Sequence, residues 1–337
     1  MEMFNLDTLS QRIGPNLERS GNIDYLREVE IYFNEVIKSY DIEFAYDIGA
    51  GEVPYFKTLM YTEWARSFIM SPLNVEVKLR QIADATADVN LTNYDYVGYI
   101  KSSLIAENAN KYANRVVNTT NEIRPNLVVL PGDNKLKSTV CLNKLRQIKA
   151  DHGNDVWFKP HPITSYKLVG ELKDIFGNDC VLDRDEDVYR YLIGADRVYT
   201  SHSSETAVYA ISLDKIIEPI DVYHLVHRGS FYFINKSLFT VESPKEWLNH
   251  VMNSSKSGII NPVLDPNWKQ KIDDYLIYIM GVRETFKGKY LALPKKSAVT
   301  PKDNPALVKP VEVNTNAGIL EVDTTADTLV NTTPWTS

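Results

Sequence analysis

Two short segments combine residue types that bind or transfer charge, and each lies where a strand is expected to end. Segment 158–162, Phe-Lys-Pro-His-Pro, has two prolines that fix the backbone around the His161 imidazole. Segment 200–205, Thr-Ser-His-Ser-Ser-Glu, offers hydroxyl and backbone N–H groups to an anion at the expected start of a helix. Taken alone, the first segment is also interpreted as a rigid turn, and the second as a helix N-cap by Ser203 or Ser204. Together, at two strand ends of one sheet, they predict a pyrophosphate or phosphodiester site.

A third segment places an acidic residue beside glycines. Asp47 follows an expected buried strand, and Gly49 and Gly51 behind it allow a ligand to approach the backbone closely. Asp47 either caps the following turn or acts as a general base that faces the phosphate site across a cleft between two domains. Glu52 is an alternative for the base, and the residues alone leave the choice open.

Several familiar site patterns are missing from the sequence. The glycines after Asp47 lack the third glycine of a dinucleotide-binding fingerprint, and there is no Gly-x-Ser-x-Gly elbow of an ordinary esterase. His224 and His227 are the one closely spaced histidine pair, which is a weak signal for a metal site. Only Cys141 and Cys180 are present, too few for a disulfide framework or a thiolate metal site. We therefore expect no metal cofactor.

The composition predicts a globular protein of two domains. The chain has 337 residues, of which 44% are hydrophobic, and roughly 150 residues is a typical domain length. No apolar run approaches the ~20 residues that cross a bilayer, so we expect no membrane span and a cytoplasmic location. The formal charge of −7 gives no global attraction to nucleic acid, although basic residues cluster between positions 283 and 296. The composition leaves the oligomeric state open.

The elements that must position the two strand-end segments alternate along the second half of the chain. Apolar runs predict strands at 127–130, 156–158, 180–182, 197–200 and 215–220. Helical spacing predicts helices at 138–150, 166–176, 188–193 and 204–212. This alternation is typical of a doubly wound α/β domain, a parallel sheet covered on both faces. The acidic residues between 183 and 187 are interpreted as a solvated helix start.

The first part of the chain is less regular. Spacing predicts helices at 25–39, 75–87 and 105–117, a strand at 42–48 and, near the C-terminus, a long helix at 268–286. We expect four segments: an N-terminal acceptor-side domain 1–125, a donor domain 126–264, a closing helix with a basic segment 265–296, and a flexible tail 297–337.

The order of these motifs resembles that of the bacterial GT-B sialyltransferases and polysialyltransferases, and of related capsule glycosyltransferases that use CMP-activated sugars. The CDP-glycerol transferases are similar. The likeness rests on the Lys-Pro-His-Pro segment at 159–162, the Ser-Ser pair at 203–204 and the Asp-Ile-Gly segment at 47–49, where Ile48 replaces the second acidic residue of the family motif. It implies a GT-B-like α/β fold, two doubly wound domains facing across a cleft, with the N-terminal domain reduced and a flexible C-terminal tail.

The resemblance implies an inverting transfer of a sugar from a CMP-type nucleotide donor to a hydroxyl group, without a metal. Asp47 takes the role of base, with Glu52 as the alternative, and His161 binds and protonates the leaving phosphate. The residues assigned to the nucleotide-sugar donor are Gly132, Lys159, Ser201, Ser203, Ser204 and Glu205.

Two acceptors fit this scheme. One is a glycan, and the other is DNA with hydroxymethylated bases, if the enzyme is encoded by a phage and acts in an infected bacterial cell. The acidic net charge disfavours DNA, and the basic cluster between 283 and 296 favours it. A protein of a different class remains as an alternative, a non-catalytic sugar-nucleotide-binding or assembly protein with the same fold.

Overall fold

The computed structural model describes residues 28–29, 31–32, 35–36, 56–62, 67–72, 75–107, 120–221 and 230–286. The chain divides into two compact units, Met1–Thr285 and Phe286–Ser337. The helices and strands described below belong to the first unit, apart from the last residue of one helix. A boundary therefore follows Thr285, whereas the sequence predicts boundaries after residues 125, 264 and 296.

Short runs after residue 125, largely buried except in the last strand, form a parallel sheet. From one edge to the other its strands are β4 (Val156–Lys159), β3 (Asn126–Val129), β5 (Arg197–Thr200) and β6 (Ile216–Pro219). Asn126 lies opposite both Val156 and Arg197, and every pairing is parallel. An isolated parallel bridge from Phe158 to Val181 continues the sheet beyond β4. The predicted strands at 127–130, 156–158, 197–200 and 215–220 are thus confirmed, and segment 180–182 forms only this bridge.

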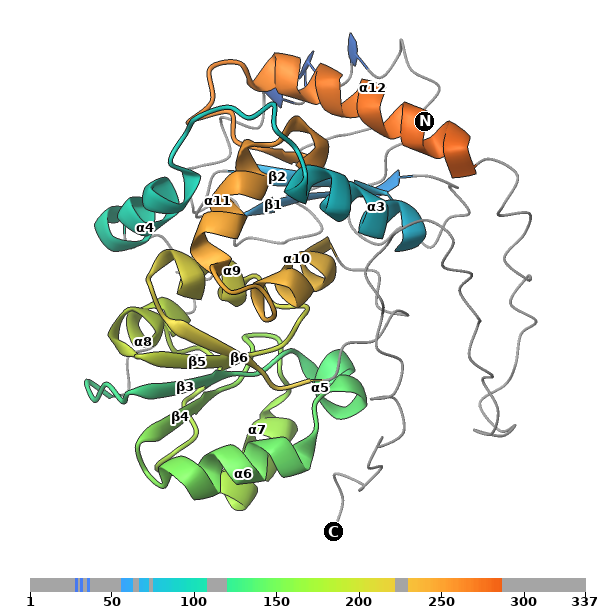
Figure 1. Ribbon diagram of the computed structural model, residues 1–337. Helices are drawn as coiled ribbons and strands as arrows, with labels where there is room; N and C mark the ends of the chain where they lie inside the picture. Colours follow the sequence, from blue (N-terminus) through green and yellow to red (C-terminus); the bar gives the residue numbers. More distant parts are fainter. Residues whose placement is uncertain are drawn as a thin grey trace, which may run out of the picture. The chain divides into compact units, whose positions relative to one another are not determined.

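Helices cover both faces of this sheet (Figure 1), because the chain runs outward from β3 to β4 and then returns to β5 on the other side. α6 and α7 lie on one side, and α8 and α9 lie on the other. The helices are α5 (Asp133–Thr139), α6 (Leu142–His152), α7 (Tyr166–Phe176), α8 (Val188–Gly194) and α9 (Thr206–Ser212). The described part of the chain is therefore a mixed α/β structure with a parallel sheet.

The predicted helix at 138–150 is wrong at its start, because the chain breaks between α5 and α6. Val140 is extended (φ −87°, ψ 130°) and forms an antiparallel bridge with Asp221. The Cys141 amide donates to the carbonyl of Ile220 (3.4 Å). Pairing with the segment after β6 thus interrupts a helix that local spacing alone favours. The predictions for α7 and α8 are confirmed, and α9 begins at Thr206, two residues later than predicted.

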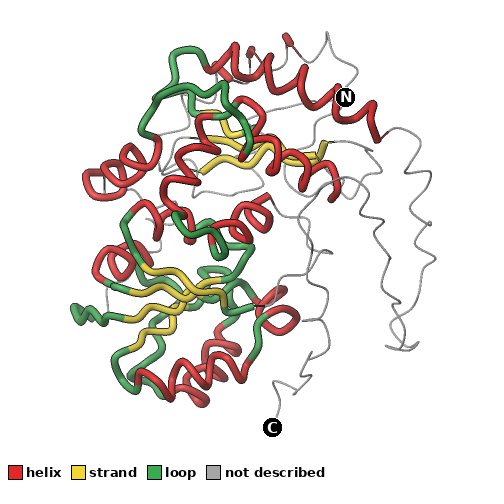
Figure 2. The backbone as a smooth tube through the Cα atoms, viewed as in Figure 1, coloured by secondary structure: helices red, strands yellow, loops and turns green. Residues whose placement is uncertain are grey.

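A second sheet, which the sequence does not predict, is antiparallel. It consists of β1 (Phe56–Thr62), β2 (Ser67–Pro72) and β7 (Ile259–Ile260), in the order β1-β2-β7. Phe68 pairs with Ile260 and Ile69 with Ile259, so strands from the two ends of the described chain complete one sheet. Figure 2 shows its strands as a group separate from those of the parallel sheet.

The remaining helices pack around and between the sheets. They are α3 (Val75–Thr86), α4 (Tyr96–Glu107), α10 (Ser230–Leu238), α11 (Pro244–Asn253), the short 3-10 helix η3 (Ser255–Ser257) and α12 (Trp268–Phe286). The predictions of α3 and α12 are confirmed. The few described residues within the predicted helix 25–39 are helical, and the predicted strand 42–48 lies outside the described residues.

Helix α4 begins earlier than the helix predicted at 105–117. Residues 105–107 of that prediction are helical, and residues 108–117 lie outside the described part. The start of α4 is set by Asp95, whose carboxylate accepts a hydrogen bond from the Gly98 amide (2.8 Å). Tyr96, Ile100 and Leu104 follow at helical spacing and are fully buried. They join one hydrophobic core, which extends from the antiparallel sheet through α4, α9 and α11 to the parallel sheet.

Candidate functional site

The carboxyl ends of the four parallel strands meet at one edge of the sheet, which we call the strand-end edge. Strand order reverses between β3 and β5, since the chain leaves β3 toward β4 and later returns to β5. Ligands of doubly wound sheets bind beyond the strand ends at such a reversal. The loop with Gly132 follows β3, the loop with His161 follows β4, and Ser201–Ser204 follow β5. These predicted site segments therefore share one edge, with β3 between the other two.

Gly132 lies at the start of α5, in extended conformation (φ −64°, ψ 166°), and is buried. The next residue, Asp133, joins this loop to the one after β4, because its two carboxylate oxygens accept from the amide of Ser165 (3.1 and 3.2 Å). Ser165 is in turn the N-cap of α7 and accepts from the Leu168 amide (3.4 Å). The first two loops of the edge are thus held together.

Lys159, the last residue of β4, is only 1% exposed. Its amine donates to the carbonyls of Pro160 (2.6 Å) and Arg184 (2.7 Å), so it fastens the loop before α8 to the strand end. Burial lowers the pKa of this amine to about 7, although nearby carboxylates, Asp185 first among them, raise it in part. The structure thus shows Lys159 bound to two backbone carbonyls.

His161 is half-buried in a turn that is fixed on both sides. Its Nδ1 accepts from the amide of Ile163 (3.2 Å), and its carbonyl accepts from the amide of Thr164 (2.8 Å). Arg184 donates to the carbonyl of Thr164 (2.7 Å), which anchors the turn to the neighbouring loop. The imidazole is therefore held in one place at the strand-end edge, as its two flanking prolines predict.

The third loop, which follows β5, consists of residues 201–204, and we call it the serine loop. Ser201 is buried, Ser203 and Ser204 are half-buried, and the hydroxyls of Ser201 and Ser203 lie 2.7 Å apart. Ser204 accepts from the amide of Thr206 (3.2 Å) at the start of α9. The loop thus places two coupled hydroxyls and one capping hydroxyl beside the end of β5.

The amides of the serine loop have partners inside the fold. The amide of residue 202 donates to the Asp221 carboxylate (2.9 Å), and those of residues 203 and 204 donate to the side chain and carbonyl of Ser201 (3.0 and 2.9 Å). The expectation that this helix start presents free N–H groups to an anion is wrong for these amides. The hydroxyls, rather than the amides, are the donors that this loop offers.

A buried acid–imidazole pair stands behind the serine loop, and sequence reasoning did not assign it. Nδ1 of His202 lies 2.7 Å from Oδ1 of Asp221, and these side chains are 7% and 2% exposed. The imidazole packs against Tyr232 (5.5 Å between ring centroids) and Phe239 (4.9 Å) of the α10 region. Asn235, also on α10, donates to the carbonyls of residues 202 (2.8 Å) and 204 (2.6 Å).

The acidic residues at this edge accept hydrogen bonds from within the fold, and two of them are buried. Glu205 accepts a hydrogen bond from the hydroxyl of Tyr209, one turn further along α9. Asp187 caps α8 through the Tyr189 amide (3.0 Å), and Glu186 accepts from Tyr191 (2.9 Å). Asp187 and Glu186 are buried, so the prediction of a solvated helix start between 183 and 187 is wrong for them.

Asp47 and Glu52, the two candidate bases, lie outside the described residues, as do His224 and His227. Of the basic cluster, only Arg283 falls within α12. Among the residues that the structure does describe, no group of three or more His, Cys, Asp or Glu side chains is arranged to hold a metal ion. None of the described helices is both long and apolar enough to cross a membrane.

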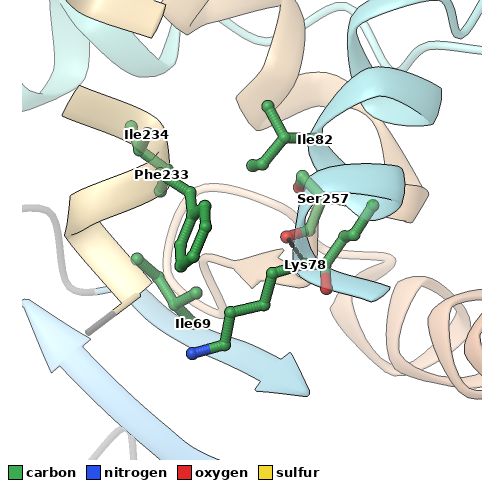
Figure 3. A pocket seen from close by; sticks show the side chains of 7 residues that line it. Ile69, Lys78, Ile82, Phe233, Ile234 and Ser257 are labelled. Atoms are coloured by element: carbon green, nitrogen blue, oxygen red, sulfur yellow. Dashed lines mark hydrogen bonds between the residues drawn. The ribbon is translucent and has the colours of Figure 1, made fainter. Parts of the chain in front are cut away.

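One pocket, lined by none of the loops described above, lies between α3 and α10 (Figure 3). Its lining is largely apolar, and the Lys78 amine lies 5.5 Å from the centre of the Phe233 ring. Gln81 donates to the carbonyls of Ser257 (2.5 Å) and Met70 (3.3 Å). The amide of Gln81 is thus used in joining α3 to β2 and η3.

Comparison with known proteins adds no assignment. No protein-family model matches the chain, and a search of curated proteins finds no match.

Proposed function

We propose that the protein is a glycosyltransferase of GT-B-like architecture that binds a CMP-type nucleotide sugar at the strand-end edge and transfers the sugar with inversion. One observation carries the proposal: the strand order puts the His161 turn and the serine loop on either side of the Gly132 loop. Neighbouring strands lie ~4.8 Å apart, so the two outer loops are separated by roughly 10 Å. A single nucleotide at the edge would contact all of these loops.

In the proposed reaction the acceptor hydroxyl oxygen forms a bond to the anomeric carbon as the bond from that carbon to the donor phosphate breaks. The bonding electrons pass to the phosphate oxygen. Asp47 or Glu52 takes the acceptor proton, and His161 donates a proton or a hydrogen bond to the leaving phosphate. The Ser203 and Ser204 hydroxyls bind the same phosphate.

The other assigned residues have supporting roles in this proposal. Lys159 holds the loop before α8 through two carbonyls, and Ser201 fixes the hydroxyl of Ser203. The carboxylate of Glu205 repels phosphate, so we assign it to a sugar hydroxyl of the donor. Hydrogen-bond donors that the fold already holds in position need little rearrangement when charge develops on the phosphate.

The first test is the affinity for CMP, measured by calorimetry. His161→Ala should weaken binding by at least about tenfold, because a charge-assisted hydrogen bond to phosphate is lost. His152→Ala is the matched control, since this half-buried histidine contacts Tyr199 (2.8 Å) from the end of α6. Equal effects of the two substitutions, or no CMP binding by the unaltered protein, would overturn the assignment of the site.

The second test is transfer itself, with a panel of CMP-sugars read by mass spectrometry. Offering both a glycan and hydroxymethylated DNA as acceptors decides between the two acceptor classes. Asp47→Asn should lower turnover about 10²- to 10⁴-fold if Asp47 is the base, and Glu52→Gln should do so if Glu52 is. CMP binding without transfer to either acceptor would assign the protein to the non-catalytic sugar-nucleotide-binding class.

A further inference from the structure

We propose that Asp221 and Asn235 are positioning residues that hold the serine loop in the shape that binds ligand. We call these two residues the loop brace. They come from separate parts of the chain, the segment after β6 and helix α10, and both form hydrogen bonds with the backbone of the serine loop. Neither was assigned a role in the reaction proposed above.

Asp221 binds the loop through one carboxylate oxygen. Its Oδ1 accepts from both the backbone amide (2.9 Å) and the ring Nδ1 (2.7 Å) of His202. Because the carboxylate is almost fully buried, it has little competing hydration, and losing it would leave two polar groups of His202 buried without these bonds. The carboxylate therefore fixes residue 202 by its main chain and its side chain together.

Asn235 binds the same loop through its amide nitrogen. Its Nδ2 donates to the carbonyls of residues 202 (2.8 Å) and 204 (2.6 Å), and the residue is fully buried. The reversed orientation of the side-chain amide would bring an oxygen against two carbonyl oxygens, so the donor assignment is determined. Carboxylate and amide thus hold a donor and two acceptors of the loop backbone.

His202 is the anchor of this arrangement. Its ring packs against Tyr232 and Phe239, so the imidazole extends into the α10 region. Its neighbours Ser201 and Ser203 instead form the hydroxyl pair of the site. The side chain of residue 202 is therefore fixed in the core, whereas residues 203 and 204 are half-buried at the strand-end edge.

The identity of the ligand rests on the proposed function, so the test has two readouts. Amide hydrogen exchange of residues 202–204 reports the shape of the loop without any ligand, and calorimetry with CMP reports binding. Asp221→Ala should raise exchange of these amides and weaken CMP binding, each by at least about tenfold. Asp221→Asn keeps an acceptor oxygen and should change each by less than about threefold.

Asp88→Ala is the matched control for loss of a buried carboxylate. Asp88 is 2% exposed and accepts from the amide of Asn90 (3.2 Å), the hydroxyl of Ser254 (2.6 Å) and the amine of Lys256 (3.1 Å). Its removal should lower overall stability but leave the exchange of residues 202–204 and the affinity for CMP unchanged. If Asp221→Ala prevents folding, Asn235→Ala takes its place, with the same expected results.

A double substitution separates positioning from general damage. If the brace acts through the serine loop, adding Asp221→Ala to Ser203→Ala should weaken CMP binding less than it does alone. Unchanged exchange in Asp221→Ala, an equal loss in Asp221→Asn, or full additivity with Ser203→Ala would each overturn the brace. If the unaltered protein fails to bind CMP, the proposed function is wrong, and hydrogen exchange alone then decides whether the brace exists.

Discussion

Lys159 is a cation that folding removes from water at the end of a strand. Its two carbonyl acceptors, on Pro160 and Arg184, compensate for part of the lost hydration. Since burial lowers the pKa of the amine to about 7, the folded protein releases this proton at a much lower pH than the unfolded chain, where the ordinary value is 10.5. Protonation of this side chain is thus linked to stability.

The linkage predicts a pH dependence with a definite sign. Between about pH 7 and 10.5 the unfolded chain binds the Lys159 proton and the folded protein does not, so the free energy of unfolding rises with pH. Lys159→Met lacks this proton. In urea unfolding between about pH 7 and 9.5, the stability of the unaltered protein relative to Lys159→Met should increase with pH. A constant difference across this range would contradict the lowered pKa.

The positions of the candidate site loops could be predicted from the sequence, whereas the residues that hold one of these loops from a distance could not. His161 and the serine loop stand directly after strands, so the pattern that predicts each strand also predicts where the following loop lies. Asp221 and Asn235 reach the loop from 19 and 33 residues further along the chain. No local spacing encodes such contacts, because they depend on how β6 and α10 pack.

At the scale of elements, the junction between η3 and β7 depends on a glycine. Gly258 has a positive φ of 70°, and its carbonyl accepts from the amide of Met70 in β2 (2.8 Å). A Cβ at this position would meet the carbonyl oxygen of Met70 and crowd the ring of Tyr275. Only glycine fits both the backbone angle and this close approach.

Gly258→Ala should therefore destabilise the protein by more than about 1–2 kcal/mol, the usual cost of a left-handed backbone for a residue with a Cβ, since the clash adds to it. Gly170→Ala is the control, because a Cβ there meets nothing within 4 Å on the exposed side of α7. This control should be stabilising by roughly 0.5–1 kcal/mol. The free energies of unfolding in urea decide the matter, and similar values for the two variants would contradict the close approach at Gly258.

Elements with a clear periodic pattern were the predictable ones. α7 buries Leu168, Leu172 and Phe176 at helical spacing, and β3 is buried throughout, so each has a local signature. β7 has two residues, too few for any pattern, and exists because β2 pairs with it. The start of α4 was not predicted, because the cap at Asp95 rather than a long apolar pattern determines where the helix begins.

At the scale of the molecule, Asp214 connects the turn after α9 to two other helices, α4 and α11. It lies in the turn between α9 and β6 in a left-handed conformation (φ 59°). Its carboxylate accepts from Lys101 of α4 (2.5 Å) and Lys245 of α11 (2.6 Å). These hydrogen bonds lower its pKa to about 2. The turn at the edge of the parallel sheet is thereby tied to two helices outside that sheet.

Asp214→Asn should weaken this connection while keeping a residue that tolerates the left-handed backbone. We expect a loss of roughly 0.2–1 kcal/mol for each exposed ion pair at neutral pH, decreasing at high salt. The stabilisation by a carboxylate with a lowered pKa is complete above its ordinary value of 3.8 and is lost as the pH falls toward 2. Denaturation curves of the two proteins should therefore converge at acidic pH, and a difference independent of pH would contradict this.

The pairing of β2 with β7 also has a consequence for synthesis of the chain on the ribosome. All four strands of the parallel sheet lie between β2 and β7 in sequence. They therefore emerge before β7 and can assemble while β2 still lacks this partner. The antiparallel sheet closes afterwards, with Tyr275 joining Gln81 across 194 residues. The nascent chain would thus expose the edge of β2 until nearly the whole of the first unit has been made.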